Sequence, residues 1–118
     1  MKSIEIISIP VTDQTRAKDF YLKLGFNMIV EAPFDGGQQW IQLGFPNSEV
    51  SITLVTWFDN MPPGCINGLV IKTDDLDKEI ENLTANGISV APIDHTPWGK
   101  FAAVLDPDGN RLSLHQGR

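Results

Sequence analysis

The sequence has few residues that bind metals or form disulfides. It contains one cysteine, Cys65, and two histidines, His95 and His115. A single cysteine excludes a disulfide within the chain and a structural zinc site built on cysteines. Two histidines leave few soft ligands for a transition metal. We expect Cys65, which follows a glycine and has no cationic neighbour in the sequence, to be an unreactive thiol.

Basic residues and long apolar runs are also scarce. Nine Lys and Arg against fifteen Asp and Glu give a net charge of −6, which argues against a nucleic acid or an anionic membrane as partner. No window approaches the roughly 18 apolar residues of a membrane helix. The N-terminal run lacks the pattern of a signal peptide, so we expect a soluble, cytoplasmic protein. Its 118 residues, 42% of them hydrophobic, suit one domain with its own core.

An internal repeat organises the chain. Residues 11–13 precede a helical stretch that stops at Gly25, and 62 residues later residues 73–75 precede another that stops at Gly87. The same offset pairs Leu43 with Leu105, Ile52 with Leu114 and Ser51 with Ser113. The pattern predicts two units of about residues 1–57 and 68–118, joined by the Pro/Gly-rich linker 58–67.

Each unit reads as a strand, a helix and three further strands. The first unit is predicted to hold strands at 4–11, 26–30, 39–45 and 50–57, and the second at 69–73, 88–92, 101–105 and 112–116. Asp13 and Asp75 are the expected N-caps of the two helices. The apolar stripes that would face the core are Ala17, Phe20, Tyr21 and Leu24 on the first helix, and Leu76, Ile80 and Leu83 on the second.

Two runs carry a resemblance to a known family. The run from Val11 to Phe26 resembles the opening signature of the vicinal-oxygen-chelate superfamily, which includes glyoxalase I, extradiol dioxygenases and bleomycin-binding resistance proteins. The run from Asp106 to Leu112 resembles its closing signature, and residues 97–99 the loop that often precedes it. The resemblance covers the whole chain. It implies an α+β fold of two βαβββ modules that form an open, mixed, eight-stranded barrel-like sheet with the helices outside, and it implies a homodimer.

Enzymes of this family usually hold a divalent metal through one ligand from each of four strands, with histidine on the first strand of each module and glutamate on the last. The matching positions here are Ile6, Gly68 and Ser113, with either Ser51 or Thr53 as the fourth. None is His, Asp or Glu, and a symmetric partner would bring the same four residues. We therefore expect no metal and no cofactor. His95, in a proline-rich loop, is interpreted as an exposed polar residue.

Strand alternation predicts which side chains line the cavity that the resemblance implies. The candidate ligand-binding residues are Ser8, Trp40, Gln42, Ser51, Thr53, Lys72, Trp98, Arg111, Ser113 and His115. Lys72 and Arg111 either favour an anionic ligand or lie in solvent at strand ends. Trp98 either covers the ligand by stacking or anchors its loop. His115 is the one candidate acid–base group, because its ordinary pKa is near neutral.

Three hypotheses for function follow. The first is a metal-free member of the family that binds an unidentified small molecule, for sequestration or for ligand-responsive recognition. The second is a lyase, isomerase or dioxygenase of the glyoxalase type, with an atypical metal site or metal-free chemistry led by His115. The third is an interaction module whose cavity is filled by side chains. Fold alone does not choose among them.

Overall fold

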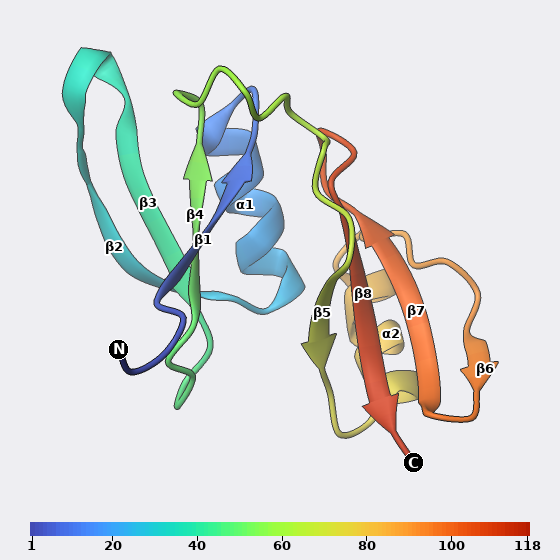
Figure 1. Ribbon diagram of the computed structural model, residues 1–118. Helices are drawn as coiled ribbons and strands as arrows, with labels where there is room; N and C mark the ends of the chain where they lie inside the picture. Colours follow the sequence, from blue (N-terminus) through green and yellow to red (C-terminus); the bar gives the residue numbers. More distant parts are fainter.

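Two four-stranded sheets, each with one helix, make up the computed structural model, which describes residues 1–118 (Figure 1). The first module contains β1 (Ile6–Pro10), α1 (Gln14–Leu24), β2 (Asn27–Pro33), β3 (Gln39–Gly44) and β4 (Ser51–Val55), with a short 3-10 turn at Asp35–Gly37. The second contains β5 (Leu69–Lys72), α2 (Leu76–Ala85), β6 (Asp94–Thr96), β7 (Gly99–Leu105) and β8 (Arg111–Gly117). Neither helix is long and apolar enough to cross a membrane.

The two sheets have the same strand order. The first is β1-β4-β3-β2 and the second β5-β8-β7-β6. In each sheet the first strand of the module pairs in parallel with the last, and the other pairs are antiparallel. The α+β class and the paired modules agree with the expectation. The eight strands form two open sheets, however, with no ladder joining one to the other.

Local hydrogen bonds set the ends of both helices as the sequence predicts. The Asp13 carboxylate accepts a bond from the Arg16 amide at 3.1 Å, and the Asp75 carboxylate accepts one from the Lys78 amide at 3.1 Å. Each satisfies an amide that a helix N-terminus leaves unpaired. At the end of α1, Gly25 has a φ of 121°, a backbone conformation that glycine adopts readily.

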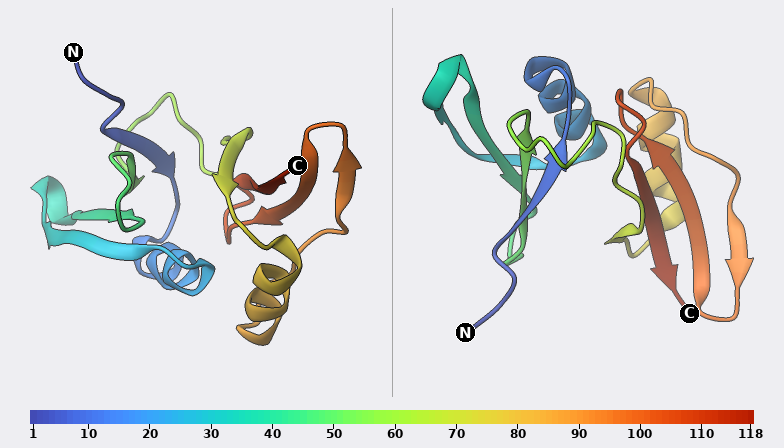
Figure 2. Two further views of the ribbon diagram at one scale, coloured as in Figure 1. Left: turned by 90° about the horizontal axis from the view of Figure 1, so that it is seen from below. Right: turned by 45° about the horizontal axis from the view of Figure 1, so that its top comes forward.

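One core of 17 buried residues serves both modules. The α1 residues Ala17, Tyr21 and Leu24 belong to it, and so do Leu76 and Leu83 of α2. Seen from below, both helices lie on the same side of the sheets, and the helix-free faces of the two sheets lie on the other side without facing each other (Figure 2, left). The shared core therefore lies on the helix-covered side of both sheets.

The second strand of the second module lies later in the chain than expected. The predicted strand at 88–92 is wrong, and β6 pairs with β7 from Asp94, opposite Phe101. The Ala91 amide does donate to the Ala103 carbonyl at 2.9 Å. Pro92, which follows, has no amide hydrogen and cannot extend a ladder. His95, expected in a loop, lies exposed on β6.

The 62-residue offset, which was expected to pair the two units along their whole length, is also wrong beyond the helices. Leu105, the predicted counterpart of Leu43, is 58% exposed, whereas Leu43 is fully buried. Val104 is the buried equivalent, because it lies opposite Leu112 as Leu43 lies opposite Ile52. The offset has fallen from 62 to 61 by β7, before Val104, and it falls to 60 at Leu112 because the connection between β7 and β8 is one residue shorter than that between β3 and β4.

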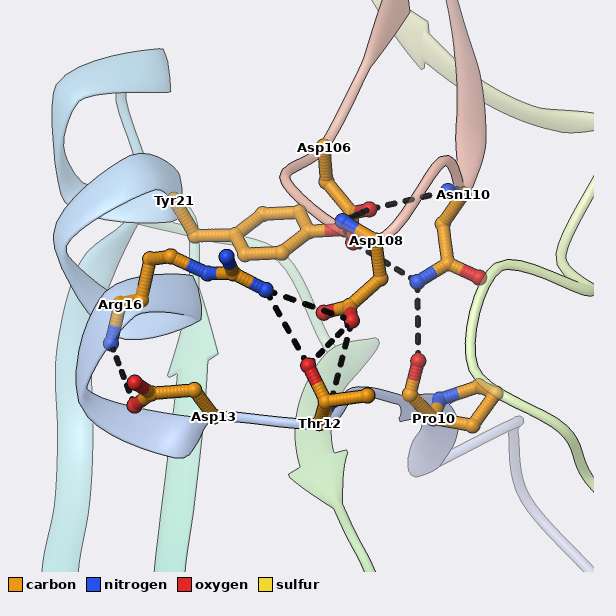
Figure 3. Close-up of polar contacts among 8 residues, drawn as sticks. All are labelled: Pro10, Thr12, Asp13, Arg16, Tyr21, Asp106, Asp108 and Asn110. Atoms are coloured by element: carbon orange, nitrogen blue, oxygen red, sulfur yellow. Dashed lines mark hydrogen bonds and ion pairs between the residues drawn. The ribbon is translucent and has the colours of Figure 1, made fainter.

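A buried polar cluster joins the first module to the closing turn of the second (Figure 3). The Tyr21 hydroxyl donates to Asp106 Oδ2 at 2.8 Å. The Asn110 side-chain amide donates to the same oxygen at 2.7 Å and to the Pro10 carbonyl at 2.9 Å. Burial and the neighbouring Asp106 carboxylate raise the pKa of Tyr21 above its ordinary value, so its hydroxyl stays protonated.

The exposed side of this cluster adds contacts from the start of α1. The Thr12 hydroxyl donates to Asp108 Oδ1 at 2.6 Å, and the Arg16 guanidinium lies 3.5 Å from the same oxygen. Residues of both family signatures therefore meet here. Their role in this chain is to hold the modules together.

Candidate functional site

Five of the predicted ligand-binding residues lie on the first sheet. Ser8 of β1 is opposite Thr53 of β4, which is in turn opposite Gln42 of β3. Their neighbours along the strands, such as Leu43 and Leu54, are core residues. Ser8, Trp40, Gln42, Ser51 and Thr53 thus occupy the helix-free face of this sheet, as alternation predicts.

A chain of hydrogen bonds crosses this face. The Trp40 indole donates to Gln42 Oε1 at 3.2 Å, and Gln42 Nε2 donates to Ser51 Oγ at 2.8 Å. Ser51 Oγ donates to the carbonyl of Glu5 at 3.2 Å. The Ser8 and Thr53 hydroxyls lie 3.5 Å apart. The bonded chain fixes the orientation of the Trp40 ring before any ligand arrives.

The other five predicted residues belong to the second module. Arg111 and Ser113 of β8 line a cavity of about 260 Å³ together with Asp94 and Phe101. Lys72 lies opposite His115 but borders a different, mainly apolar groove of about 310 Å³ that also touches Ile7 of β1. Neither Lys72 nor Arg111 forms an ion pair.

His115 has an aromatic and a backbone neighbour but no carboxylate partner. Its ring stacks on Phe101 with centroids 4.2 Å apart. Its Nε2 lies 3.2 Å from the Trp98 carbonyl oxygen. A hydrogen bond to that carbonyl requires the proton on Nε2 and leaves Nδ1 as the free acceptor. The Trp98 side chain itself is 73% exposed.

One chain does not bring the ten residues together. Apart from Trp98 in the β6–β7 turn, the two groups lie on the helix-free faces of different sheets, and those faces do not face each other (Figure 2). No cavity of the chain is lined by predicted residues of both groups. On the first face Ser51 and Thr53 are buried, while Ser8, Trp40 and Gln42 are half-buried.

Residues 3–114 match the family described as the Glyoxalase/Bleomycin resistance protein/Dioxygenase superfamily. The chain belongs to this superfamily. No curated protein matches the sequence significantly.

Several solved structures of the superfamily share the whole fold. TnmS3, an antibiotic binding protein from Streptomyces sp. CB03234, is 39% identical with a TM-score of 0.94, over 100% of this chain and 98% of that one. A glyoxalase/bleomycin resistance protein from the same organism is 41% identical with a TM-score of 0.86, over 97% and 100%. A superfamily member from Sphaerobacter thermophilus DSM 20745 is 27% identical with a TM-score of 0.87, over 98% of each chain.

Strand register decides which residue occupies the fourth position that superfamily enzymes use for metal. Ser113 of β8 lies opposite Val70 of β5. The first-module counterpart of Val70 is Ser8, because the two N-caps fix the 62-residue offset in this part of each unit. Ser8 lies opposite Thr53. Thr53, and not Ser51, is therefore the equivalent of Ser113.

The residues at these positions do not fit a divalent metal. Ile6 and Gly68 offer no side-chain donor, and Thr53 and Ser113 offer neutral hydroxyls where the superfamily's enzymes have carboxylates. Gly68 also has a φ of 90°, which a histidine rarely adopts. No three His, Cys, Asp or Glu side chains lie close enough together to hold a metal ion. We therefore derive no reaction step through a metal.

The sequence analysis missed three aromatic residues beside Trp40. Phe34 follows β2, and Trp57 and Phe58 follow β4, and these three together with Trp40 form what we call the aromatic cluster. Trp57 lies between the others, with ring centroids 4.8 Å from Phe34 and 6.2 Å from both Trp40 and Phe58. The available signal was the concentration of aromatics just beyond two strands, but contact between them depends on the β3–β4 pairing.

Proposed function

We propose that the protein binds a small organic molecule, of the antibiotic type, without a divalent metal, and so sequesters it. A homodimer would complete the binding site. The observation that carries this proposal is the donor set at the four metal positions, where Ile6, Gly68, Thr53 and Ser113 stand on an otherwise complete superfamily scaffold. The 39% identity to an antibiotic binding protein over the whole chain supports the class of ligand.

The direction of the two helix-free faces supports the homodimer. Each face lacks an opposing wall in one chain (Figure 2). A twofold axis that set the first-module face of one protomer against the second-module face of its partner would create two identical sites. Each site would then contain all ten predicted ligand-binding residues, five from each chain. Exposed apolar side chains such as Leu105 and Trp98 would be covered in the same step.

Metal titration tests the metal-free part of the proposal. Isothermal titration of the purified protein with Ni²⁺, Mn²⁺, Zn²⁺ and Fe²⁺ should show no tight, stoichiometric site. The matched control is the double variant Ile6→His/Thr53→Glu, which places two superfamily-type ligands on neighbouring strands and should gain measurable affinity for Ni²⁺ or Zn²⁺. Tight stoichiometric binding of one of these metals by the unmodified chain would overturn the proposal.

Native mass spectrometry tests the rest. The protein as isolated should run as a dimer of 13.1 kDa chains and carry an organic adduct or accept one from an antibiotic collection. A monomer that binds no member of the collection would contradict it. Turnover of a bound compound that is lost in His115→Ala would instead identify a metal-free enzyme, for which the absence of a carboxylate on His115 gives little structural support.

A further inference from the structure

The aromatic cluster is a surface feature that the fold does not need. None of its four residues belongs to the 17-residue core. Phe34 is 39% exposed and Phe58 45% exposed, and Trp40 and Trp57 are half-buried. Two of the three tryptophans of the chain are here. Grouped aromatic rings left in water cost free energy, and such patches on a monomer are usually contact surfaces.

The geometry of the cluster favours a flat partner. The Trp40 and Trp57 rings lie at an interplanar angle of 21°, close to parallel, with centroids 6.2 Å apart. Phe34 lies against both, 5.7 Å from Trp40 and 4.8 Å from Trp57. Extended ring faces in this arrangement offer area for offset stacking, which a conjugated planar molecule uses better than a compact, saturated one.

Trp40 is also oriented in advance. Its indole nitrogen donates to Gln42, Gln42 donates to Ser51, and Ser51 donates to the Glu5 carbonyl. A ring that is already fixed loses little conformational entropy when a ligand stacks on it. The half-buried Ser8 on the same face supplies a hydroxyl for the substituents of such a ligand, whereas Thr53 beside it is buried.

The charges beside the cluster are acidic. Asp35 directly follows Phe34 and Asp59 directly follows Phe58, and neither forms an ion pair. The two basic residues that suggested an anionic ligand, Lys72 and Arg111, lie on the other sheet. An uncharged or cationic ring system therefore suits this end of the first sheet better than an anion.

We propose that the aromatic cluster of Phe34, Trp40, Trp57 and Phe58 is a stacking site that selects a planar, conjugated, uncharged or cationic ring system. The inference rests on the proposed function and names the class of ligand for that site. The four rings bind the flat portion of the molecule, and the polar residues of the same face bind its substituents.

Titration calorimetry with two cationic probes tests the selectivity. Proflavine is planar and conjugated, and amantadine is a saturated cage. Proflavine should bind at least about tenfold more tightly, since stacking on exposed aromatics is worth this much. Trp57→Leu should weaken proflavine binding at least about tenfold, and by more than Trp98→Leu. The control Leu22→Ala changes a side chain that is as exposed as Phe34, at 39%, on the surface of α1 and should have no effect.

Three results would overturn the inference. The first is equal affinity for the two probes, and the second is a larger loss of proflavine affinity in Trp98→Leu than in Trp57→Leu. The third is a Trp57→Leu protein whose oligomeric state, measured by light scattering, differs from that of the parent. The last result would make the cluster a subunit contact. In each case, binding of another small molecule by the parent protein would leave the proposed function standing. Thermal unfolding of each variant checks that it is folded.

Discussion

Tyr21 is the buried side chain of the first module that bonds to the closing turn of the second. Its hydroxyl donates to the buried Asp106 carboxylate at 2.8 Å. We expect Tyr21→Phe to lower the free energy of unfolding by about 2 kcal/mol, the value typical of a hydrogen bond to a charged acceptor. Urea denaturation measures it. The control Lys23→Met breaks an exposed pair with Asp19 and should change stability by less than about 0.5 kcal/mol; equal effects would argue against the role of Tyr21.

The same residue predicts how stability depends on alkaline pH. In the fold, burial and Asp106 raise the pKa of Tyr21, while in the unfolded chain the pKa is the ordinary value of about 10. Below pH 10 both states hold the proton, so the contribution to stability is complete. Above it, only the unfolded state loses the proton, and the free energy of unfolding should fall by about 1.4 kcal/mol per pH unit from this group.

Because Tyr21 is the only tyrosine, its ionisation can be followed directly. Absorbance of tyrosinate should appear together with the loss of the circular dichroism of the fold as pH rises. The difference in stability between the parent and Tyr21→Phe should shrink over the same range. Ionisation near pH 10 in a protein that is still folded would contradict the assigned environment.

At the scale of single elements, the two helix N-caps should be energetically equivalent. Asp13→Ala and Asp75→Ala each remove one bond to a terminal amide, so each should cost about 1 kcal/mol. The sites are in different modules, and the double variant should lose the sum, about 2 kcal/mol. Asp74→Ala, next to a cap, should have no measurable effect in the same urea denaturation. A loss of stability in only one of the two cap variants would show that the two caps are not energetically equivalent.

Helices were predicted from sequence more accurately than strands for a physical reason. The Asp13 cap and the Gly25 stop act within a few residues, so the sequence itself contains their partners. The place of β6 depends instead on which carbonyls of β7 remain free, and Pro92 moved the pairing past the expected strand. The repeat offset failed at Leu105 because the segment between α2 and β7 is one residue shorter than the segment between α1 and β3, and such a change shifts every later strand.

At the scale of the whole molecule, alternation assigned nine of the ten site residues to helix-free faces and left Trp98 in a loop, while the family resemblance placed the metal positions at Ile6, Gly68, Ser113 and one of two hydroxyl residues. It could not show that the two faces do not face each other. Their direction follows from contacts between modules, such as Tyr21 with Asp106, that join residues 85 positions apart. The aromatic cluster was missed for the same reason, since Phe34 and Trp57 meet across strands that are distant in sequence.

If the site is shared between protomers, defects on the two faces should complement each other. Trp40→Leu alters the first-module face, and Ser113→Phe obstructs the second-module face. Each variant alone should lose proflavine binding in calorimetry. After the two are mixed and their subunits exchange, half of the dimers would be mixed, and about one site in four would combine two intact faces.

The mixture should therefore regain about a quarter of the parent's binding capacity, with the parent's affinity. A site contained within one chain gives a different result, because every site in the mixture would keep one defect and no binding would return. A site confined to the first-module face gives a third, in which Ser113→Phe binds as the parent does. Only recovery on mixing agrees with a pocket whose two walls come from different protomers, and we expect it because the two faces of the single chain do not face each other.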